Sequence, residues 1–158
     1  MSTIHYLKGD ATLPHAAGEK IIAHICNDLG GWGKGFVLAI SKRWTSPEKE
    51  YREWHRNRAR NDFALGAIQI VQVGSYIHVA NMIGQQGMNS GSDGPPIRYE
   101  AVRECLDKLA KVAKEMGASV HMPRIGTGLV GGKWERIEPI ILETLVAQGV
   151  PVYVYDFG

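Results

Sequence analysis

The 158-residue sequence has few of the features that mark secreted or membrane proteins. Its only two cysteines, Cys26 and Cys105, lie far apart in apolar runs, which favours buried thiols of a cytosolic protein over a disulfide framework. No run approaches the length of a membrane span, and residues 1–8 hold no apolar segment long enough for a signal peptide. We therefore expect a cytoplasmic protein with no membrane partner.

Charge of one sign and internal repetition are equally scarce. Eighteen Lys and Arg against sixteen Asp and Glu leave a net charge of +2, too little to predict nucleic-acid binding, which needs a concentrated basic face. The basic run from Arg52 to Arg60 could contact nucleic acid, but a solvated helix face is the simpler interpretation. No repeat, linker or low-complexity tract interrupts the chain, so we expect a single domain over residues 1–158.

Apolar patterning predicts an α/β fold. Strand-like runs occupy residues 4–7, 20–25, 66–73, 76–82, 118–122 and 150–155. Helical spacing begins at residue 36, at 46, at 99 and at 134. Strands and helices alternate except for one hairpin over residues 66–82, which predicts a three-layer sandwich with a mixed central β-sheet flanked by helices. Ligands of such folds bind in the crevice beyond the carboxyl ends of the strands.

Glycine is slightly abundant, with 19 residues, and two of its clusters follow expected strands, at 30–35 and 126–132. Such turns leave backbone N–H groups open to a phosphate, although glycines that only permit a positive φ would give the same pattern. Neither cluster is a P-loop or a G-x-G-x-x-G fingerprint, since Lys34 is followed by Gly35 rather than by a hydroxyl residue. We expect a phosphate-bearing ligand and neither a metal nor a cofactor. The long irregular stretch 84–96 is of the kind that is often functional.

Taken in order, four motifs resemble those of a macrodomain, and the resemblance covers essentially the whole chain. The motifs are the pair Gly9 and Asp10, residues 24–27 with 30–35, residues 122–129, and residues 154–157. The most similar branch holds the yeast ADP-ribose 1″-phosphate phosphatase and the short macrodomains that cleave ADP-ribose from acylated groups.

The resemblance implies a ligand-binding residue for each part of ADP-ribose. Asp10, with the backbone of Ala11, would bind the adenine amino group, although its alternative role is a turn cap. Asn27 would contact the distal ribose. Phe157 would pack against adenine, or else is a C-terminal core aromatic. The remaining implied residues shape the loops around the ribose and the diphosphate: Gly33, Lys34, Gly35, Gly126, Thr127, Gly128 and Leu129.

Three residues are candidates for catalysis. His24 stands three residues before Asn27, as a histidine does in the phosphatase-like branch, and would act as general acid or base; the alternative is a hydrogen-bonded core histidine. Asp28 would lie beside the distal ribose, and Asn81 could orient a water there. The sequence departs from some short macrodomains, because residues 81–83 hold no lysine and Val130 replaces an aspartate.

The resemblance thus implies binding of ADP-ribose and slow hydrolysis of a derivative at the distal ribose. The substrate would be ADP-ribose 1″-phosphate or an ADP-ribosylated protein or nucleic acid. A reader module that binds ADP-ribose without turnover is the alternative, and a nucleic-acid-binding domain is a weaker one.

Overall fold

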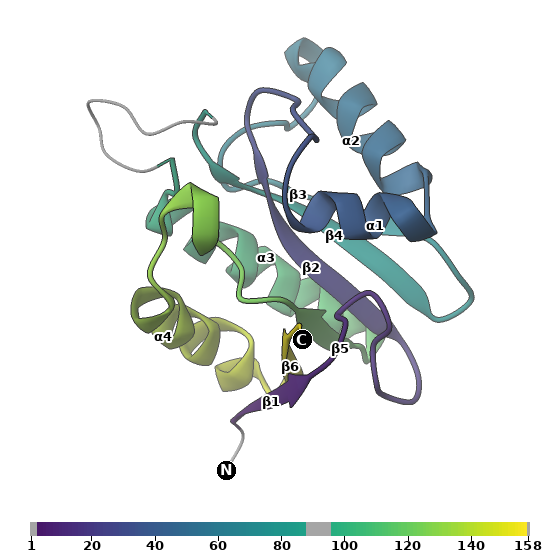
Figure 1. Cartoon of the computed structure of the whole chain (residues 1–158), viewed down its shortest axis with the longest axis vertical. Helices are drawn as coiled ribbons and strands as arrows, with labels where there is room; N and C mark the ends of the chain where they lie inside the picture. Colours follow the sequence, from purple (N-terminus) through teal and green to yellow (C-terminus); the bar gives the residue numbers. More distant parts are fainter. Residues whose placement is uncertain (1–2, 88–95, 158) are drawn as a thin grey trace.

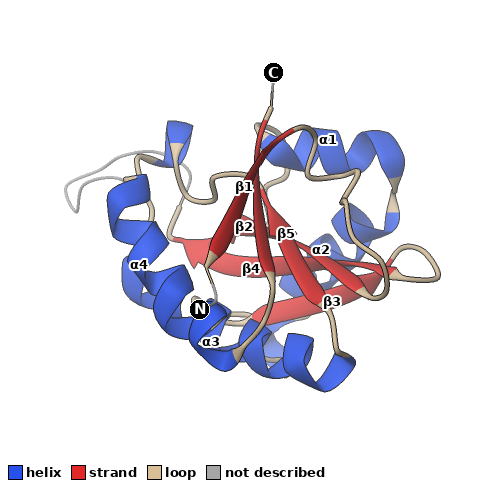
Figure 2. Ribbon diagram, turned by 90° about the horizontal axis from the view of Figure 1, so that it is seen from below, coloured by secondary structure: helices blue, strands red, loops and turns tan. Residues whose placement is uncertain are grey.

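One six-stranded sheet organises the computed structural model, which describes residues 3–87 and 96–157 (Figure 2). Its strands are β1 (Ile4–Lys8), β2 (Lys20–Asn27), β3 (Ile68–Gln72), β4 (Ile77–Gln85), β5 (Ser119–Met122) and β6 (Val152–Asp156). The order across the sheet is β1-β6-β5-β2-β4-β3. Five strands are parallel, and only the edge strand β3 pairs antiparallel, with β4. The carboxyl ends of the five parallel strands therefore meet at one edge of the sheet.

Helices cover both faces of this sheet. They are α1 (Phe36–Arg43), α2 (Ser46–Arg56), α3 (Tyr99–Met116) and α4 (Trp134–Thr144), with short 3-10 turns at Arg58–Arg60, Gly128–Val130 and Val146–Gln148. Figure 1 shows α1 and α2 on one side of the sheet and α3 and α4 on the other. The expected three-layer α/β sandwich with a mixed sheet is confirmed.

Strand β2 shows why the sheet is covered twice. Its side chains alternate between two cores: Ile21 and Ala23 pack in the cluster with α3 and α4, whereas Ile22 and Cys26 pack in the cluster with α1 and α2. A near-continuous apolar run is what burial on both faces requires. Both cysteines are free and buried, as expected.

The α3 helix follows its sequence pattern closely. Its inward positions include Val102, Leu106 and Leu109, all fully buried, at the helical spacing of three and four residues. Gly117 ends the helix in the left-handed conformation, with φ +66°, and its N–H group bonds to the carbonyls of Ala113 and Lys114. A C-terminal glycine of this kind satisfies carbonyls that the helix leaves open.

Some boundaries differ from expectation, mainly at the carboxyl edge. Strand β2 continues to Asn27, with a register irregularity after Cys26, and β4 continues to Gln85. The last helix ends at Thr144 and passes into a 3-10 turn before Gly149, where φ is +81°. Of the irregular stretch 84–96, residues 88–95 lie outside the described residues. No helix of the described chain is long and apolar enough to cross a membrane.

Candidate functional site

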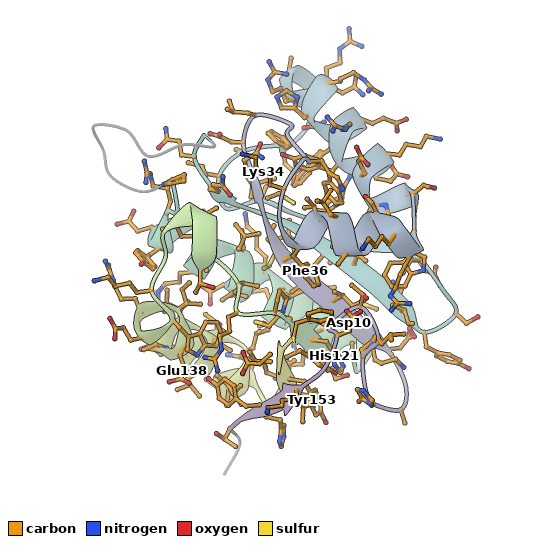
Figure 3. All side chains as sticks on the ribbon, in the orientation of Figure 1. Asp10, Lys34, Phe36, His121, Glu138 and Tyr153 are labelled. Atoms are coloured by element: carbon orange, nitrogen blue, oxygen red, sulfur yellow. The ribbon has the colours of Figure 1, made fainter. Side chains whose placement is uncertain are left out.

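The carboxyl edge of the sheet collects residues from five separate segments. Asp10 follows β1, Asn27 ends β2, Gln85 ends β4, residues 123–132 follow β5, and Phe157 follows β6. The parallel pairing places these segments at the same edge. In Figure 3 the labelled residues Lys34, Phe36 and Asp10 follow one another downward from the upper middle of the view to just right of its centre. The sequence motifs therefore converge where ligands of parallel sheets bind.

Asn27 organises the first glycine loop. Its Oδ1 atom accepts hydrogen bonds from the backbone N–H groups of Leu29 at 2.9 Å and Gly31 at 3.0 Å, and from the Tyr51 hydroxyl at 3.0 Å. Its Nδ2 atom donates to the Gly31 carbonyl at 2.9 Å. The Tyr51 hydroxyl, from α2, also donates to the Asn27 backbone carbonyl at 2.6 Å. Because the loop and Tyr51 already occupy the side-chain oxygen, a contact with a ribose would fall to the remaining amide hydrogen.

Helix α2 supports this loop from behind. Gly30 has φ +79°, and a Cβ atom there would lie 2.5 Å from Nδ1 of His55. The Arg52 guanidinium donates to the Gly30 carbonyl at 3.0 Å. The sequence does not indicate that Tyr51 and His55 support the loop, because no local pattern links α2 to residues some twenty positions earlier.

The start of α1 has open backbone donors. Gly35, in a positive-φ conformation at +81°, precedes the helix and offers no side-chain cap, and the first turn holds no acidic residue. The first N–H groups of a helix lack intrahelical acceptors, and the helix dipole favours an anion beside them. Lys34 is exposed directly before this turn and adds a positive charge.

The second glycine loop is built around a close backbone approach. A Cβ atom at Gly132 would lie 2.0 Å from the carbonyl oxygen of Gly126, so the loop can fold back on itself only with glycine there. Gly126 and Gly128 have φ values of +72° and +75°. The Thr127 hydroxyl donates to the Arg124 carbonyl at 2.7 Å. The glycines are thus required by the conformation of the loop itself.

The same loop presents unpaired donors. Across residues 3–87 and 96–157, the N–H groups of Gly126, Thr127 and Gly128 have no protein acceptor. Three successive open N–H groups form the kind of concave donor set that binds phosphate oxygens. The two interpretations of the loop are therefore compatible: the positive φ values create the turn, and the turn leaves these N–H groups without a protein acceptor.

The structure shows an ion pair at this edge that the sequence did not predict. The Arg124 guanidinium binds the Asp156 carboxylate through two bonds, Nε to Oδ1 at 2.7 Å and Nη2 to Oδ2 at 3.0 Å. This hydrogen bonding lowers the pKa of Asp156 and raises that of Arg124. The partners are 32 positions apart, so only their places at the ends of neighbouring strands β5 and β6 could have suggested the contact.

Asp10 is held by its own turn. Its Oδ1 atom accepts from the Thr12 backbone N–H at 2.8 Å and the Thr12 hydroxyl at 2.6 Å, and Arg43 lies 3.3 Å from Oδ2. Partial burial raises the Asp10 pKa, but the bonds from Thr12 and Arg43 outweigh it, and the net pKa is below its usual value. The group is therefore an ionised acceptor, suited to an amino donor. Ala11 beside it is buried.

Phe157 is 86% exposed. The alternative expectation, a C-terminal core aromatic, is wrong, because β6 ends at Asp156 and the next residue already lies past the edge of the sheet. Its packing against adenine stays a prediction.

His24 and Asn81 lie in the core between the sheet and α1 and α2. His24 Nε2 is 2.5 Å from Asn81 Oδ1, and its ring packs edge-on against Trp32 at 5.4 Å between centroids. Burial lowers the His24 pKa to about 4, so the ring is neutral at pH 7. Asn81 Nδ2 donates to the Pro47 carbonyl at 3.1 Å and to Gln69 Oε1 at 3.0 Å. This geometry favours the core-histidine alternative, and a catalytic role for either residue stays a prediction.

Asp28 is the catalytic candidate that lies at the carboxyl edge. Its Oδ1 atom accepts from the Gly87 backbone N–H at 2.8 Å, and its own N–H donates to the Gln85 carbonyl at 3.0 Å. The side chain is half-buried, and Oδ2 accepts no hydrogen bond from the described part of the chain. That oxygen could therefore orient a water molecule. Within the described residues, no group of three His, Cys, Asp or Glu side chains is placed to hold a metal ion.

Fold and site together define an α/β sandwich with two glycine-rich loops and open backbone donors at one edge of its sheet. The chain belongs to the Macro domain family, whose model matches residues 23–141. It is 59% identical to a macrodomain protein from Streptomyces coelicolor of known structure, with a TM-score of 0.89 over 98% of this chain and 99% of that one.

Curated relatives fall into two groups of different length. The chain is 31% identical to chromodomain-helicase-DNA-binding protein 1-like from Mus musculus over 99% of its own residues, but spans only 18% of that protein. It is 26% identical to the ADP-ribose 1″-phosphate phosphatase of Lodderomyces elongisporus, covering 98% of this chain and 99% of that protein.

Proposed function

We propose that this chain binds ADP-ribose along the carboxyl edge of its sheet. The observation that carries the proposal is the set of open N–H groups at Gly126, Thr127 and Gly128, with the uncapped start of α1 on the neighbouring segment. A diphosphate offers acceptors to both. Relatives named ADP-ribose 1″-phosphate phosphatase support the choice of this diphosphate over others.

The two ends of the ligand follow from the flanking residues. Adenine would lie between the Asp10 carboxylate, with the Ala11 backbone, and the exposed ring of Phe157. The distal ribose would lie at the other end, near Asn27 and the loop of Gly33, Lys34 and Gly35. An ionised Asp10 accepts from an amino group but not from a carbonyl, which would favour adenine over hypoxanthine.

For turnover, we assign hydrolysis at the distal ribose to a water held by Asp28. The carboxylate would take a proton from the water as its oxygen bonds to the anomeric C1″ carbon of the distal ribose. The bond from C1″ to the substituent, a phosphate or an acyl-linked target, would break, and the substituent would leave with the bond electrons. Positioning of the water supplies most of the acceleration, so the enzyme would be slow.

A reader without turnover is the second candidate, and the placement of His24 and Asn81 favours it. Both side chains are buried and bonded to each other, so neither reaches the edge without a rearrangement. The structure gives less support to the alternative of a nucleic-acid-binding domain. Arg52 pairs with Glu48, and Arg58 donates to the His55 carbonyl, so parts of the basic run already serve α2.

Calorimetric titration with ADP-ribose tests binding first. We expect saturable binding to the parent chain, at least tenfold weaker binding to Asp10→Ala, and weaker binding to inosine diphosphate ribose. No heat of binding to the parent would overturn the family-based proposal.

A panel of ADP-ribose 1″-phosphate, ADP-ribosylated protein and ADP-ribosylated DNA then tests turnover. Asp28→Asn should lose product release while still binding ADP-ribose, and His24→Gln should keep both. A parent that binds but releases nothing from any substrate is a reader. Loss of turnover in His24→Gln, with its folding intact, would restore the histidine as catalytic.

A further inference from the structure

The Arg124–Asp156 ion pair joins the two segments that carry the proposed ligand contacts. Arg124 lies two residues before Gly126, in the second glycine loop (residues 123–132), which is called the diphosphate loop below. Asp156 directly precedes Phe157. The two bonds between them, at 2.7 and 3.0 Å, form the planar fork that only arginine offers a carboxylate. The side chains are 38% and 46% exposed, so the pair contributes little to overall stability.

Aromatic rings restrain the arginine further. The guanidinium carbon lies 5.1 Å from the ring centroid of Tyr6 and 5.2 Å from that of Trp134. These rings are fixed to each other by a bond from Trp134 Nε1 to the Tyr6 hydroxyl at 3.0 Å, and that hydroxyl also bonds Glu138. Cation–π contacts of this kind hold an arginine in one plane.

The backbone carbonyls of Arg124 and Asp156 accept further hydrogen bonds, and one of these reaches a third segment. The Arg124 carbonyl accepts the Thr127 hydroxyl at 2.7 Å, and the Asp156 carbonyl accepts the N–H of Gly9 at 2.9 Å. Gly9 precedes Asp10. The ion pair is therefore linked at once to the diphosphate loop, to the proposed adenine-stacking Phe157 and to the proposed adenine acceptor.

We propose that Arg124 and Asp156 are positioning residues that fix the spacing between the adenine end and the diphosphate end of the site. This inference rests on the proposed binding of ADP-ribose. A fixed spacing benefits only a ligand that spans both ends, because a smaller ligand can shift with whichever segment it binds. The pair therefore sets the preference for ADP-ribose over AMP or pyrophosphate.

The test compares spanning and non-spanning ligands on Arg124→Gln and Asp156→Asn. Calorimetry gives the Kd for ADP-ribose, and NMR titration gives the Kd for AMP and for pyrophosphate. We expect about tenfold weaker binding of ADP-ribose, a range typical of a lost charge-assisted hydrogen bond, and less than about twofold change for the two fragments. The double variant should be no worse than either single one, because the two side chains act as a pair.

Two controls separate positioning from a general structural role. Arg103→Gln breaks a similarly exposed pair, 2.5 Å from Glu143 between α3 and α4, and should leave every Kd unchanged. Arg124→Lys keeps the charge but loses the fork, and should fall between the parent and Arg124→Gln.

Three outcomes would overturn the inference, and they can be told apart. A parent that binds no ADP-ribose removes the proposed function and this inference with it. A parent that binds, with variants that bind equally well, removes the inference alone. Variants that lose the fragments as much as ADP-ribose, with a lowered Tm, would make the ion pair merely structural.

Discussion

At the scale of single residues, Asn27 shows how one side chain can hold a loop. Its amide closes four hydrogen bonds with Leu29, Gly31 and Tyr51 while only 8% of the residue is exposed. The loop depends on these hydrogen bonds because its glycines have no side chains that could pack against the core. Asn27 was expected as a ribose contact; its use as the internal support of the loop depends on Tyr51, which no motif indicates.

Replacement of Asn27 by alanine should therefore destabilise the protein as well as weaken ligand binding. The change leaves the N–H groups of Leu29 and Gly31 and the Gly31 carbonyl with one partner fewer, at a cost of about 2–3 kcal/mol. The Tyr51 hydroxyl keeps its 2.6 Å bond to the backbone carbonyl of residue 27. Urea unfolding measures the difference. Gln72→Ala, on the exposed end of β3, is the matched control and should stay within about 0.5 kcal/mol of the parent.

Two buried histidines make stability depend on pH. Burial lowers the pKa of His24 and of His121 from 6.5 to about 4. His121 is fully buried, bonded to Ser119 and Tyr155 at 2.7 Å each. An unfolded chain protonates these rings near pH 6.5 and the folded chain only near pH 4, so protonation favours unfolding. The stabilisation is complete above pH 6.5 and is lost as the pH falls towards 4.

Between pH 7 and pH 5 we expect a loss on the order of 2 kcal/mol per buried histidine. The glutamine in His24→Gln does not titrate, so this variant should lose about half of the dependence. Urea unfolding at pH 7 and at pH 5 measures the change in unfolding free energy for each protein. An equal pH dependence in His24→Gln and the parent would contradict the assignment.

At the scale of elements, periodic segments were predictable and loops were not. The α3 helix follows from its helical spacing of apolar residues, and strand β2 follows from a short, near-continuous apolar run. The second glycine loop has no period. Its glycine content indicated a turn, but the contact of Gly132 with Gly126 and the bridge from Arg124 to Asp156 depend on tertiary geometry.

Gly132→Ala tests this loop directly. The new Cβ atom would meet the Gly126 carbonyl oxygen at 2.0 Å, so the backbone of residues 126–132 must move. We expect a loss of about 2–4 kcal/mol in unfolding free energy and loss of ADP-ribose binding. Gly33→Ala, whose Cβ atom would meet nothing within 4 Å, should unfold like the parent. Equal stability of the two variants would contradict the close approach.

At the scale of the whole molecule, the five parallel strands assemble a site that no local motif could form. They bring segments that are more than a hundred positions apart to one edge, and the residues of four sequence motifs meet there. The order of the motifs along the chain was sufficient to anticipate the edge, because parallel α/β sheets place their ligand crevice there. It left the core and the catalytic interpretation of His24 both open, and it did not indicate that Asn81 is buried.

Binding at this edge should stabilise the whole fold. At ADP-ribose a hundredfold above its Kd, mass action adds about 2.7 kcal/mol, which for a chain of this size raises Tm by about 5–10 °C. Differential scanning fluorimetry measures the shift, and Asp10→Ala should reduce it. An unchanged Tm for the parent at saturating ligand would contradict binding to the folded state.

The direction of the strands has a practical consequence for protein engineering. The chain enters the sheet at Ile4, on the amino edge, and leaves it at Asp156, on the carboxyl edge, so the two termini lie well apart (Figure 2). An affinity tag or fluorophore joined after Phe157 would emerge beside the proposed adenine position and compete with ligand or report on it. The same addition ahead of Ile4 would emerge at the opposite edge, so the two fusion ends are suited to different purposes: sensing at one, immobilisation at the other.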